Sequence, residues 1–260
     1  MRLVLIQPQL GHGSGPENLA EIRRLVDTLS APPSAEDVLL LPERFYVDVE
    51  HSGYLEAIRG LARDLGCHVV GGSHGEFAGG ELINAGIACA PDGSIVGRYE
   101  KLRPYAAERL WAHPGNAFGE FAIDGRNVMV LICADFWFAD VFQRARVLPD
   151  LVLVPALSVT RKPGPEYSRS LWRHLAIARA YEFGCYVGVS DWGHPSQLPA
   201  LFASGVAGFA DPTLTDPALF FQPVGDAAIR VFPVDFRALD AFRSDRVERG
   251  FFWKTPEAPS

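Results

Sequence analysis

The sequence has only four cysteines among its 260 residues, and no two of them lie close together along the chain. A disulfide scaffold needs a denser set, and a zinc ribbon or a dithiol redox motif needs cysteines at short spacing. The seven histidines form neither HxH nor HExxH, so the sequence offers no dedicated metal site, and we expect no cofactor. The four cysteines are therefore expected to be free thiols.

The chain also lacks a surplus of basic residues and any long apolar run. Its 24 Lys and Arg stand against 31 Asp and Glu, which gives a net charge of −7 and argues against a nucleic acid partner. The apolar run at the N-terminus is short, and no later segment approaches the roughly 18 apolar residues of a membrane span. We expect a soluble, cytoplasmic protein without a membrane partner.

Apolar residues make up 48% of the chain, and no linker or repeat divides it. This is enough for one large core, so we predict a single domain over residues 1–260, with a polar C-terminal tail from about 238 to 260. Strand-like runs alternate with helical patterns at 18–30, 54–66 and 167–183, and a hairpin is expected within 81–102. The pattern predicts a layered α/β fold with mixed sheets and helices on the outer faces.

One motif points to a serine hydrolase. The segment from Gly71 to Gly75, with Ser73 at its centre, matches the G-x-S-x-G nucleophile elbow. Such an elbow must lead into a helix, whereas here it is followed by a Gly pair and strand-like residues. The segment after the motif therefore argues against a serine hydrolase, and Ser73 is kept only as an alternative nucleophile.

Three residues at or near the ends of strand-like segments could act together. Each has an ordinary explanation alone: Glu43 as a solvated acid, Lys101 as a surface lysine and Cys133 as a small buried side chain. In combination, a carboxylate can take the proton of a thiol, and an ammonium can stabilise an oxyanion. The set therefore has the parts of a cysteine-nucleophile hydrolase.

The segments around these residues resemble, in the same order, the three signature blocks of the nitrilase superfamily of carbon-nitrogen hydrolases. The blocks are LLLPE (39–43), EKLRPYAAE (100–108) and LICADFWFAD (131–140), and flanking pieces such as Ile83-Asn84-Ala85 and DLVLVPA (150–156) are similar to the family as well. The resemblance implies a four-layer αββα sandwich with two mixed β-sheets. It also implies a homodimer or a larger assembly of this chain.

The resemblance further implies the roles of individual residues. Glu43 would be the general base, Lys101 the cation beside the tetrahedral intermediate, and Cys133 the nucleophile that forms a thioester. The oxyanion would be held by Lys101 and the backbone N–H of Ala134, and Glu108 matches the second acid of its block. Because Glu43 and Glu108 carry like charges near one lysine, we hypothesise that their pKa values are held apart.

The residues after the nucleophile bear on the substrate. In relatives that act on carboxylate-bearing substrates, arginine occupies positions that here hold Phe136 and Trp137. Aromatic rings remove the bidentate carboxylate partner, so the pocket is predicted to prefer small amides with neutral, apolar or aromatic acyl groups. Tyr105 is a third candidate for contact with substrate, and Trp137 could equally be part of the core.

Two other functions stay open at this point. The segment RPYAAERLW (103–111) resembles the corresponding block of true nitrilases, so nitrile hydrolysis is the alternative chemistry. Against it, Ala134-Asp135 after the cysteine is closer to the amidase pattern. A non-catalytic binding module on the same fold is the alternative of another class, but keeping an acid, a lysine and a thiol buried together would then have no purpose.

Overall fold

The chain folds into two mixed β-sheets, and the computed structural model describes residues 1–11, 13–47, 51–197 and 202–253. Six of the seven strands in the first sheet follow the order β13-β1-β2-β3-β5-β4, and β6 pairs with β5. Their bounds are Arg2–Ile6 (β1), Asp37–Leu40 (β2), His68–Val70 (β3), His74–Ala78 (β4), Glu81–Cys89 (β5), Ile95–Glu100 (β6) and Ile229–Pro233 (β13).

The second sheet has six strands in the order β12-β11-β10-β9-β8-β7. Its central strands β8, β9 and β10 run parallel, and antiparallel strands flank them on both sides. The strands span Gly119–Ile123 (β7), Arg126–Val130 (β8), Leu151–Pro155 (β9), Tyr186–Ser190 (β10), Gly208–Ala210 (β11) and Phe221–Pro223 (β12).

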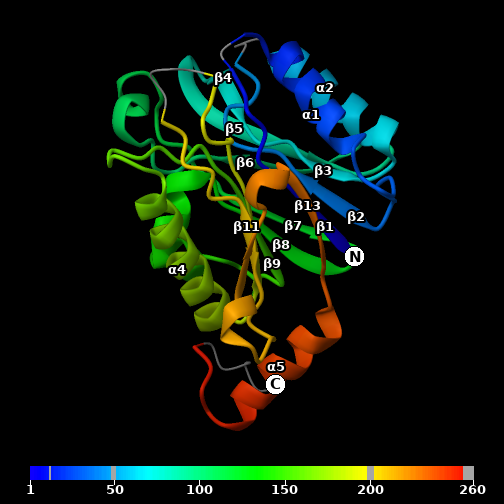
Figure 1. The fold of residues 1–260 in the computed structure, drawn as a ribbon, viewed down its shortest axis with the longest axis vertical. Coiled ribbons are helices and arrows are strands. Elements are labelled where there is room, and N and C mark those ends of the chain that lie inside the picture. Colours follow the sequence, from blue (N-terminus) through cyan, green and yellow to red (C-terminus); the bar gives the residue numbers. More distant parts are fainter. Residues whose placement is uncertain (12, 48–50, 198–201, 254–260) are drawn as a thin grey trace.

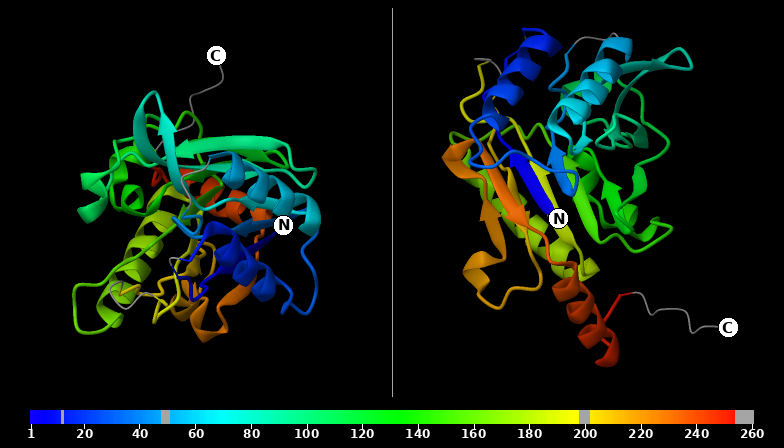
Figure 2. Two further views of the ribbon diagram at one scale, coloured as in Figure 1. Left: turned by 90° about the horizontal axis from the view of Figure 1, so that it is seen from above. Right: turned by 90° about the vertical axis from the view of Figure 1, so that its right-hand side faces the viewer.

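Helices form the two outer layers. Figure 1 shows α1 (Gly15–Val26) and α2 (His51–Leu65) side by side on the first sheet, while α4 (Glu166–Phe183) covers the second. The views in Figure 2 agree with this stacking of helix, sheet, sheet and helix. The short helix α3 (Ala139–Gln143) follows the 3₁₀ turn η2 (Cys133–Trp137). The predicted α/β class and the αββα sandwich are thus confirmed.

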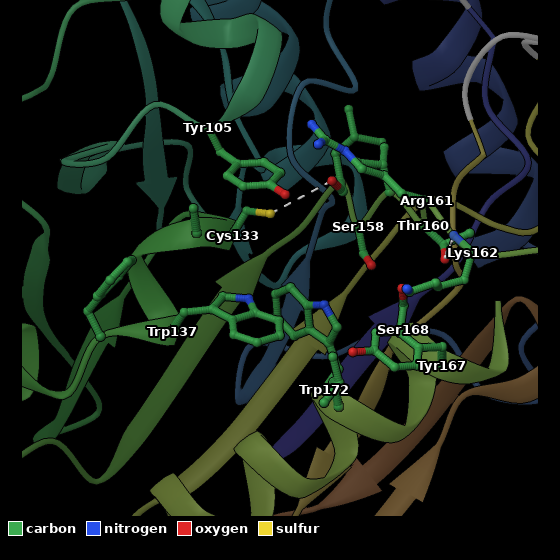
Figure 3. Close-up of a pocket in the computed structure, with 15 residues that line it drawn as sticks. Tyr105, Cys133, Trp137, Ser158, Thr160, Arg161, Lys162, Tyr167, Ser168 and Trp172 are labelled. Atoms are coloured by element: carbon green, nitrogen blue, oxygen red, sulfur yellow. Dashed lines mark hydrogen bonds between the residues drawn. The ribbon is translucent and has the colours of Figure 1, made fainter.

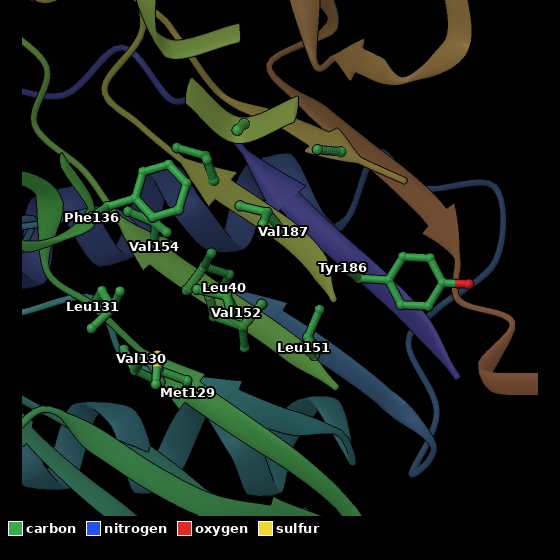
Figure 4. Close-up of a cluster of buried hydrophobic side chains, with 14 of the residues drawn as sticks. Leu40, Met129, Val130, Leu131, Phe136, Leu151, Val152, Val154, Tyr186 and Val187 are labelled. Atoms are coloured by element: carbon green, nitrogen blue, oxygen red, sulfur yellow. The ribbon is translucent and has the colours of Figure 1, made fainter. Parts of the chain in front are cut away.

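Alternating residues of β1 show how the layers are held together. Leu3 and Leu5 belong to the core cluster that also contains the second sheet, whereas Val4 and Ile6 pack with residues of α1 and α2. This is the expected result of a strand whose two faces are both buried. Figure 4 shows the core cluster between the sheets, with Leu40 of β2 near Val152 of β9.

The two sheets approach each other closely at Gly188 of β10. A Cβ atom at this position would lie 2.5 Å from Cδ2 of Leu3, well inside van der Waals contact. A larger residue would therefore push the sheets apart, since a packed interior has no spare volume.

The segment after Arg237 differs from the predicted polar tail. Residues Phe236–Glu248 form the helix α5. Asp235 caps its N-terminus, because its carboxylate accepts hydrogen bonds from the backbone N–H groups of Arg237 and Ala238. Only Leu239 and Arg246 of this helix are buried, so its apolar stripe is too narrow to stand out in the sequence. Residues 254–260 of the expected tail lie outside the described part.

Two further expectations can be compared with the fold. The hairpin within 81–102 is present, because β5 and β6 pair antiparallel around a turn in which Gly93 has a positive φ of 80°. Ser73 leads into the strand β4 and not into a helix, so the expectation that this motif lacks the helix of a serine nucleophile elbow is confirmed. In the described part of the chain, none of the helices combines the length and apolar character needed to cross a membrane.

Candidate active site

The three sequence blocks meet at one end of the sandwich, where strands of both sheets finish. Glu43 follows β2, Lys101 follows β6 directly, and Cys133 lies three residues beyond the end of β8. Glu108 comes from the 3₁₀ turn η1 (Ala106–Leu110). All four side chains are buried, so the predicted set converges although its members lie up to 90 residues apart in the chain.

A lysine between two acids forms the polar centre of the site. The Lys101 ammonium donates to Glu43 Oε1 at 2.6 Å and to Glu108 Oε2 at 2.5 Å. Asn84 of β5 donates its amide protons to the same two carboxylates, at 2.8 Å to Glu43 and 2.7 Å to Glu108. The buried negative charges are therefore met by one cation and two amide N–H bonds, as buried carboxylates require.

The main chain of Leu157, which follows β9, connects Glu43 to Cys133. Its N–H donates to Glu43 Oε2 at 3.1 Å, and its carbonyl oxygen accepts from the Cys133 thiol at 3.7 Å. Cys133 itself has a positive φ of 46°, a conformation that costs a non-glycine residue of the order of 1 kcal/mol or more. This backbone geometry holds the thiol at the start of η2, beside Glu43 and facing the adjoining cavity.

Burial and neighbouring charges set the protonation states. Burial raises the pKa of the Cys133 thiol well above its usual value, and the charge of Glu43 adds to this. Burial also raises the pKa of Glu43, while Lys101 opposes the rise and Glu108 supports it. Burial acts to lower the pKa of Lys101, but the charges around it, Glu43 foremost, outweigh this and raise it. The resting site thus holds a neutral thiol and a firmly charged ammonium beside Glu43.

Two buried aspartates lie around this centre. Asp191 accepts hydrogen bonds from the backbone of Ser158 and of Val206, and Asp135 accepts one from Leu102. Burial raises the pKa of each carboxyl to about 7. Both side chains fix loops that carry the site, because they bind the residues next to Leu157 and Lys101.

An apolar cavity of about 370 Å³ opens in front of the thiol. Figure 3 shows Tyr105, Trp137 and Trp172 around the Cys133 sulfur, and Arg161 and Lys162 line the same cavity. The rings of Trp137 and Trp172 meet edge to face, with centroids 5.7 Å apart. A cavity of this size and lining fits a small molecule with an apolar or aromatic part.

The sequence-predicted substrate contacts are only partly found in this cavity. Tyr105, Trp137 and Ala134 line it, which leaves their proposed roles open. Phe136 does not line it: its side chain is fully buried and stacks on Trp172 from the core side, so the prediction that it contacts substrate is corrected. The backbone of η2 turns adjacent residues to opposite sides, which separates Phe136 from Trp137.

Sequence reasoning missed three contributors to the site: Asn84, Asp191 and the backbone of Leu157. Asn84 lies in the segment Ile83-Asn84-Ala85, whose similarity to the family was the one signal that could have marked it. Among the described residues, no group of three metal-ligating side chains lies at this site; the one such group is elsewhere, at His51, His74 and Glu76.

The sequence of the chain is similar to those of known proteins. The family model for carbon-nitrogen hydrolases matches residues 13–216. Omega-amidase NIT2 of Mus musculus is 27% identical over 230 residues, which cover 76% of this chain and 80% of that protein. Omega-amidase NIT2 of Xenopus tropicalis is 26% identical over 209 residues, covering 68% of this chain and 74% of that protein.

Solved structures share the fold. Nit3 of Saccharomyces cerevisiae, a member of branch 10 of the nitrilase superfamily, superposes with a TM-score of 0.77 at 18% identity, covering 94% of this chain and 93% of that one. An amidase from Nesterenkonia sp. AN1, with acrylamide added to its active-site cysteine, gives 0.72 at 22% identity and covers 97% of this chain and 100% of that one.

Proposed function

The chain belongs to the carbon-nitrogen hydrolase family of the nitrilase superfamily, and from this premise we propose that it hydrolyses a small-molecule amide. The acyl group is neutral or aromatic, and the products are a carboxylic acid and ammonia or an amine. The reaction proceeds through a thioester on Cys133, with Glu43 as the general base and Lys101 as the cation that stabilises the oxyanion.

One observation carries this proposal: the Glu43 carboxylate is held between a charged lysine and a backbone N–H, next to a protonated thiol. Its two oxygens are fixed by Lys101 Nζ at 2.6 Å and by Leu157 N at 3.1 Å. A base that is held in place and lies beside a neutral thiol can take its proton as attack begins, so no free thiolate is needed beforehand.

In the first half of the reaction, Glu43 takes the proton from the Cys133 sulfur, and the sulfur forms a bond to the amide carbonyl carbon. The carbonyl oxygen becomes an oxyanion. Lys101 carries three N–H donors and uses two on the acids, which leaves the third for this oxyanion, together with the backbone N–H of Ala134. Glu43 then gives its proton to the leaving amine as the carbon-nitrogen bond breaks.

In the second half, water replaces the amine. Glu43 takes a proton from the water, the hydroxide adds to the thioester carbonyl, and the oxyanion is held as before. The carbon-sulfur bond then breaks, and the sulfur recovers the proton from Glu43. Glu108 does not touch the reacting atoms in this scheme; it holds Lys101 and Asn84 in place and keeps the ammonium charged.

The preference for a neutral or aromatic acyl group rests on the aromatic side chains of the cavity. Trp137, Phe138 and Trp172 line it, and they offer apolar surface and ring faces to a substrate. The cations Arg161 and Lys162 also line the cavity, but both are exposed. Water therefore weakens the attraction that they offer to a charged acyl group.

The proposal is tested by trapping the acyl-enzyme. Intact-protein mass spectrometry after brief mixing with a panel of aliphatic and aromatic amides and nitriles should give one acyl adduct, whose mass names the acyl group. Cys133→Ala should give none, while the control Cys89→Ala, at a fully buried thiol, should give the same adduct as wild type. Absence of any adduct or turnover with the whole panel would favour the non-catalytic binding module.

Matched substrates separate the remaining alternatives. Phenylacetamide should be turned over faster than succinamic acid, which has a carboxylate where the ring would be, and faster than phenylacetonitrile. A preference for succinamic acid would show that Arg161 and Lys162 dominate recognition, as would suit an omega-amidase. Preference for the nitrile would replace amide by nitrile hydrolysis while leaving the roles of Glu43, Lys101 and Cys133 intact.

The homodimer implied by the resemblance is part of the same proposal. Light scattering on the eluted protein should give at least twice the chain mass of 28.4 kDa. A mass equal to that of one chain, across a range of protein concentrations, would remove this part without affecting the chemistry.

A further inference from the structure

A second cluster of chemically versatile side chains lies at the edge of the first sheet, outside the active site. His51 begins α2, and His74 and Glu76 stand two residues apart on β4, so that their side chains share one face of that strand. One atom from each side chain, two ring nitrogens and a carboxylate oxygen, lies within 4.8 Å of the others. We propose that this cluster is a zinc site with His51 Nδ1, His74 Nε2 and Glu76 Oε2 as its protein ligands.

The distances between the three ligand atoms suit one small ion. His51 Nδ1 lies 3.1 Å from His74 Nε2 and 3.2 Å from Glu76 Oε2, and His74 Nε2 lies 3.9 Å from the same oxygen. Ligands that bind zinc tetrahedrally at about 2.0 to 2.1 Å stand roughly 3.3 Å apart. The triangle is therefore close to one face of such a tetrahedron before any side chain moves.

The hydrogen bonding of His74 leaves the correct nitrogen for a metal. Its Nδ1 lies 3.0 Å from the carbonyl oxygen of Ala85 and must donate to it, so in the neutral ring Nε2 carries the lone pair. The ring of Tyr54 stacks on His74 at 3.8 Å between centroids and fixes its plane. A second ring nitrogen bound to a carbonyl is the usual support of a zinc-binding histidine.

The third ligand is held equally well. Arg98 of β6 binds both oxygens of Glu76 at 2.9 Å, with one guanidinium nitrogen on each. This contact orients the carboxylate toward the histidines, and its positive charge weakens the attraction for a cation. His74 is fully buried and Glu76 nearly so, whereas the His51 side chain is 38% exposed. The fourth position of the tetrahedron therefore faces solvent and would hold water.

This site could not be predicted from the sequence, because its ligands do not follow the short spacings of metal motifs: His74 lies 23 positions after His51. The site would join the start of α2 to β4 at its edge of the sheet. The cluster is also close to the candidate active site. His74 bonds to the backbone of Ala85 on β5, and the residue before it, Asn84, donates hydrogen bonds to Glu43 and Glu108. Zinc would thus brace the strand that carries Asn84.

The test uses the full chain in a Cys133→Ala background, freed of metal and of any affinity tag, so that the active-site sulfur cannot bind the ion. Competition with a chromophoric chelator should give one equivalent of bound Zn²⁺. Co²⁺ in its place should show the strong visible bands of tetrahedral coordination. His51→Ala and Glu76→Gln should each weaken Zn²⁺ binding by at least about tenfold, and Zn²⁺ should raise the Tm of the parent but not of these variants.

A matched control is available in His113, whose Nδ1 lies 3.4 Å from Oε1 of Glu81 and for which the described residues offer no third ligand. His113→Ala should bind Zn²⁺ as the parent does. The proposal is overturned if the parent binds less than one equivalent, or if His51→Ala and Glu76→Gln bind as tightly as the parent. Because His51 is partly exposed, His51→Ala should keep the Tm of the parent in the presence of EDTA, which separates lost binding from misfolding.

Discussion

The Glu43 carboxylate and the Lys101 ammonium form a buried ion pair, with 2.6 Å between Oε1 and Nζ and only 3% of each side chain exposed. Removing one partner of such a pair leaves a charge without compensation, whereas a neutral replacement of similar shape keeps most contacts. Replacing Lys101 by an apolar residue leaves Glu43 and Glu108 without their cation, whereas a neutral replacement of Glu43 can keep its shape. The two substitutions therefore separate a loss of stability from a loss of catalysis.

Glu43→Gln should keep the fold and lose activity. The amide can still accept a hydrogen bond from Lys101, but it cannot take the thiol proton, so kcat/KM should fall by about 10²- to 10⁴-fold. Lys101→Met should lose activity too and should also lower the free energy of unfolding by about 3 to 5 kcal/mol, because two acids are left buried without their cation. Steady-state kinetics and urea unfolding of both variants check this, and wild-type kcat in Glu43→Gln would exclude the general-base role.

Glu108→Gln should shift the pH dependence of the reaction. The negative charge of Glu108 helps to raise the pKa of Glu43, so its removal should lower that pKa and move the acidic limb of the kcat/KM profile to lower pH. Glu120→Gln, at an acid paired with Arg146 away from the site, should leave the limb in place. Identical profiles for Glu108→Gln and wild type would contradict the hypothesis that the two acids hold their pKa values apart.

Stability should fall as the pH rises from about 4 to 7. The folded-state pKa of Asp135 is raised from 3.8 to about 7 by burial, so in this window the folded chain binds a proton that the unfolded chain has released. Each such carboxyl can then lower the free energy of unfolding by up to about 1.4 kcal/mol per pH unit. Urea unfolding at pH 5 and pH 7 should show this loss, and Asp135→Asn should show less of it. An equal loss in both proteins would place the cause elsewhere.

Trp137→Ala and Phe136→Ala should behave differently although the residues are neighbours. Trp137 lines the cavity and is 39% exposed, so its truncation should raise the KM of aromatic amides by roughly tenfold, the effect of about 1.4 kcal/mol of lost contact. Phe136 is fully buried, and its truncation should cost about 3 to 5 kcal/mol of stability. Kinetics with paired aromatic and aliphatic amides, together with thermal unfolding, distinguish the two effects.

Cys133→Gly should be more stable than Cys133→Ala by about 1 kcal/mol. Both substitutions remove the thiol, but only glycine adopts the positive φ of this position without a steric penalty. The usual order of the two residues is the reverse, because glycine loses more entropy on folding. Chemical denaturation of the two inactive variants measures the difference directly, and a more stable Cys133→Ala would mean that the backbone here carries no strain.

Glu43, Lys101 and Cys133 could be picked out from the sequence because each lies in a block that resembles a signature of the nitrilase superfamily. Taken alone, each of them has an ordinary explanation. Asn84 could not be picked out in this way, because its importance comes from lying opposite two carboxylates that other segments supply. The same holds for Leu157, whose hydrogen bonds to Glu43 and Cys133 are made by its main chain.

The direction in which a side chain points could not be predicted from the sequence either. Phe136 and Trp137 are chemically alike, and only the geometry of η2 decides which of them faces the cavity. Likewise, α5 has two buried residues in thirteen, and this is too weak a period to distinguish a helix from a polar tail. Fold class followed from periods repeated over the whole chain, whereas these details depend on single turns.

Because the contacts of Leu157 with Glu43 and Cys133 use main-chain atoms, they place a constraint on chain length and not on residue identity. Any residue but proline can supply the same N–H and carbonyl group, so a substitution of Leu157 should keep both contacts and act through its side chain, which lines the cavity. A deletion or insertion of one residue between β9 and Ser158 would instead exchange the two groups for those of a neighbour. Engineers who vary this loop to alter the cavity should therefore keep its number of residues fixed.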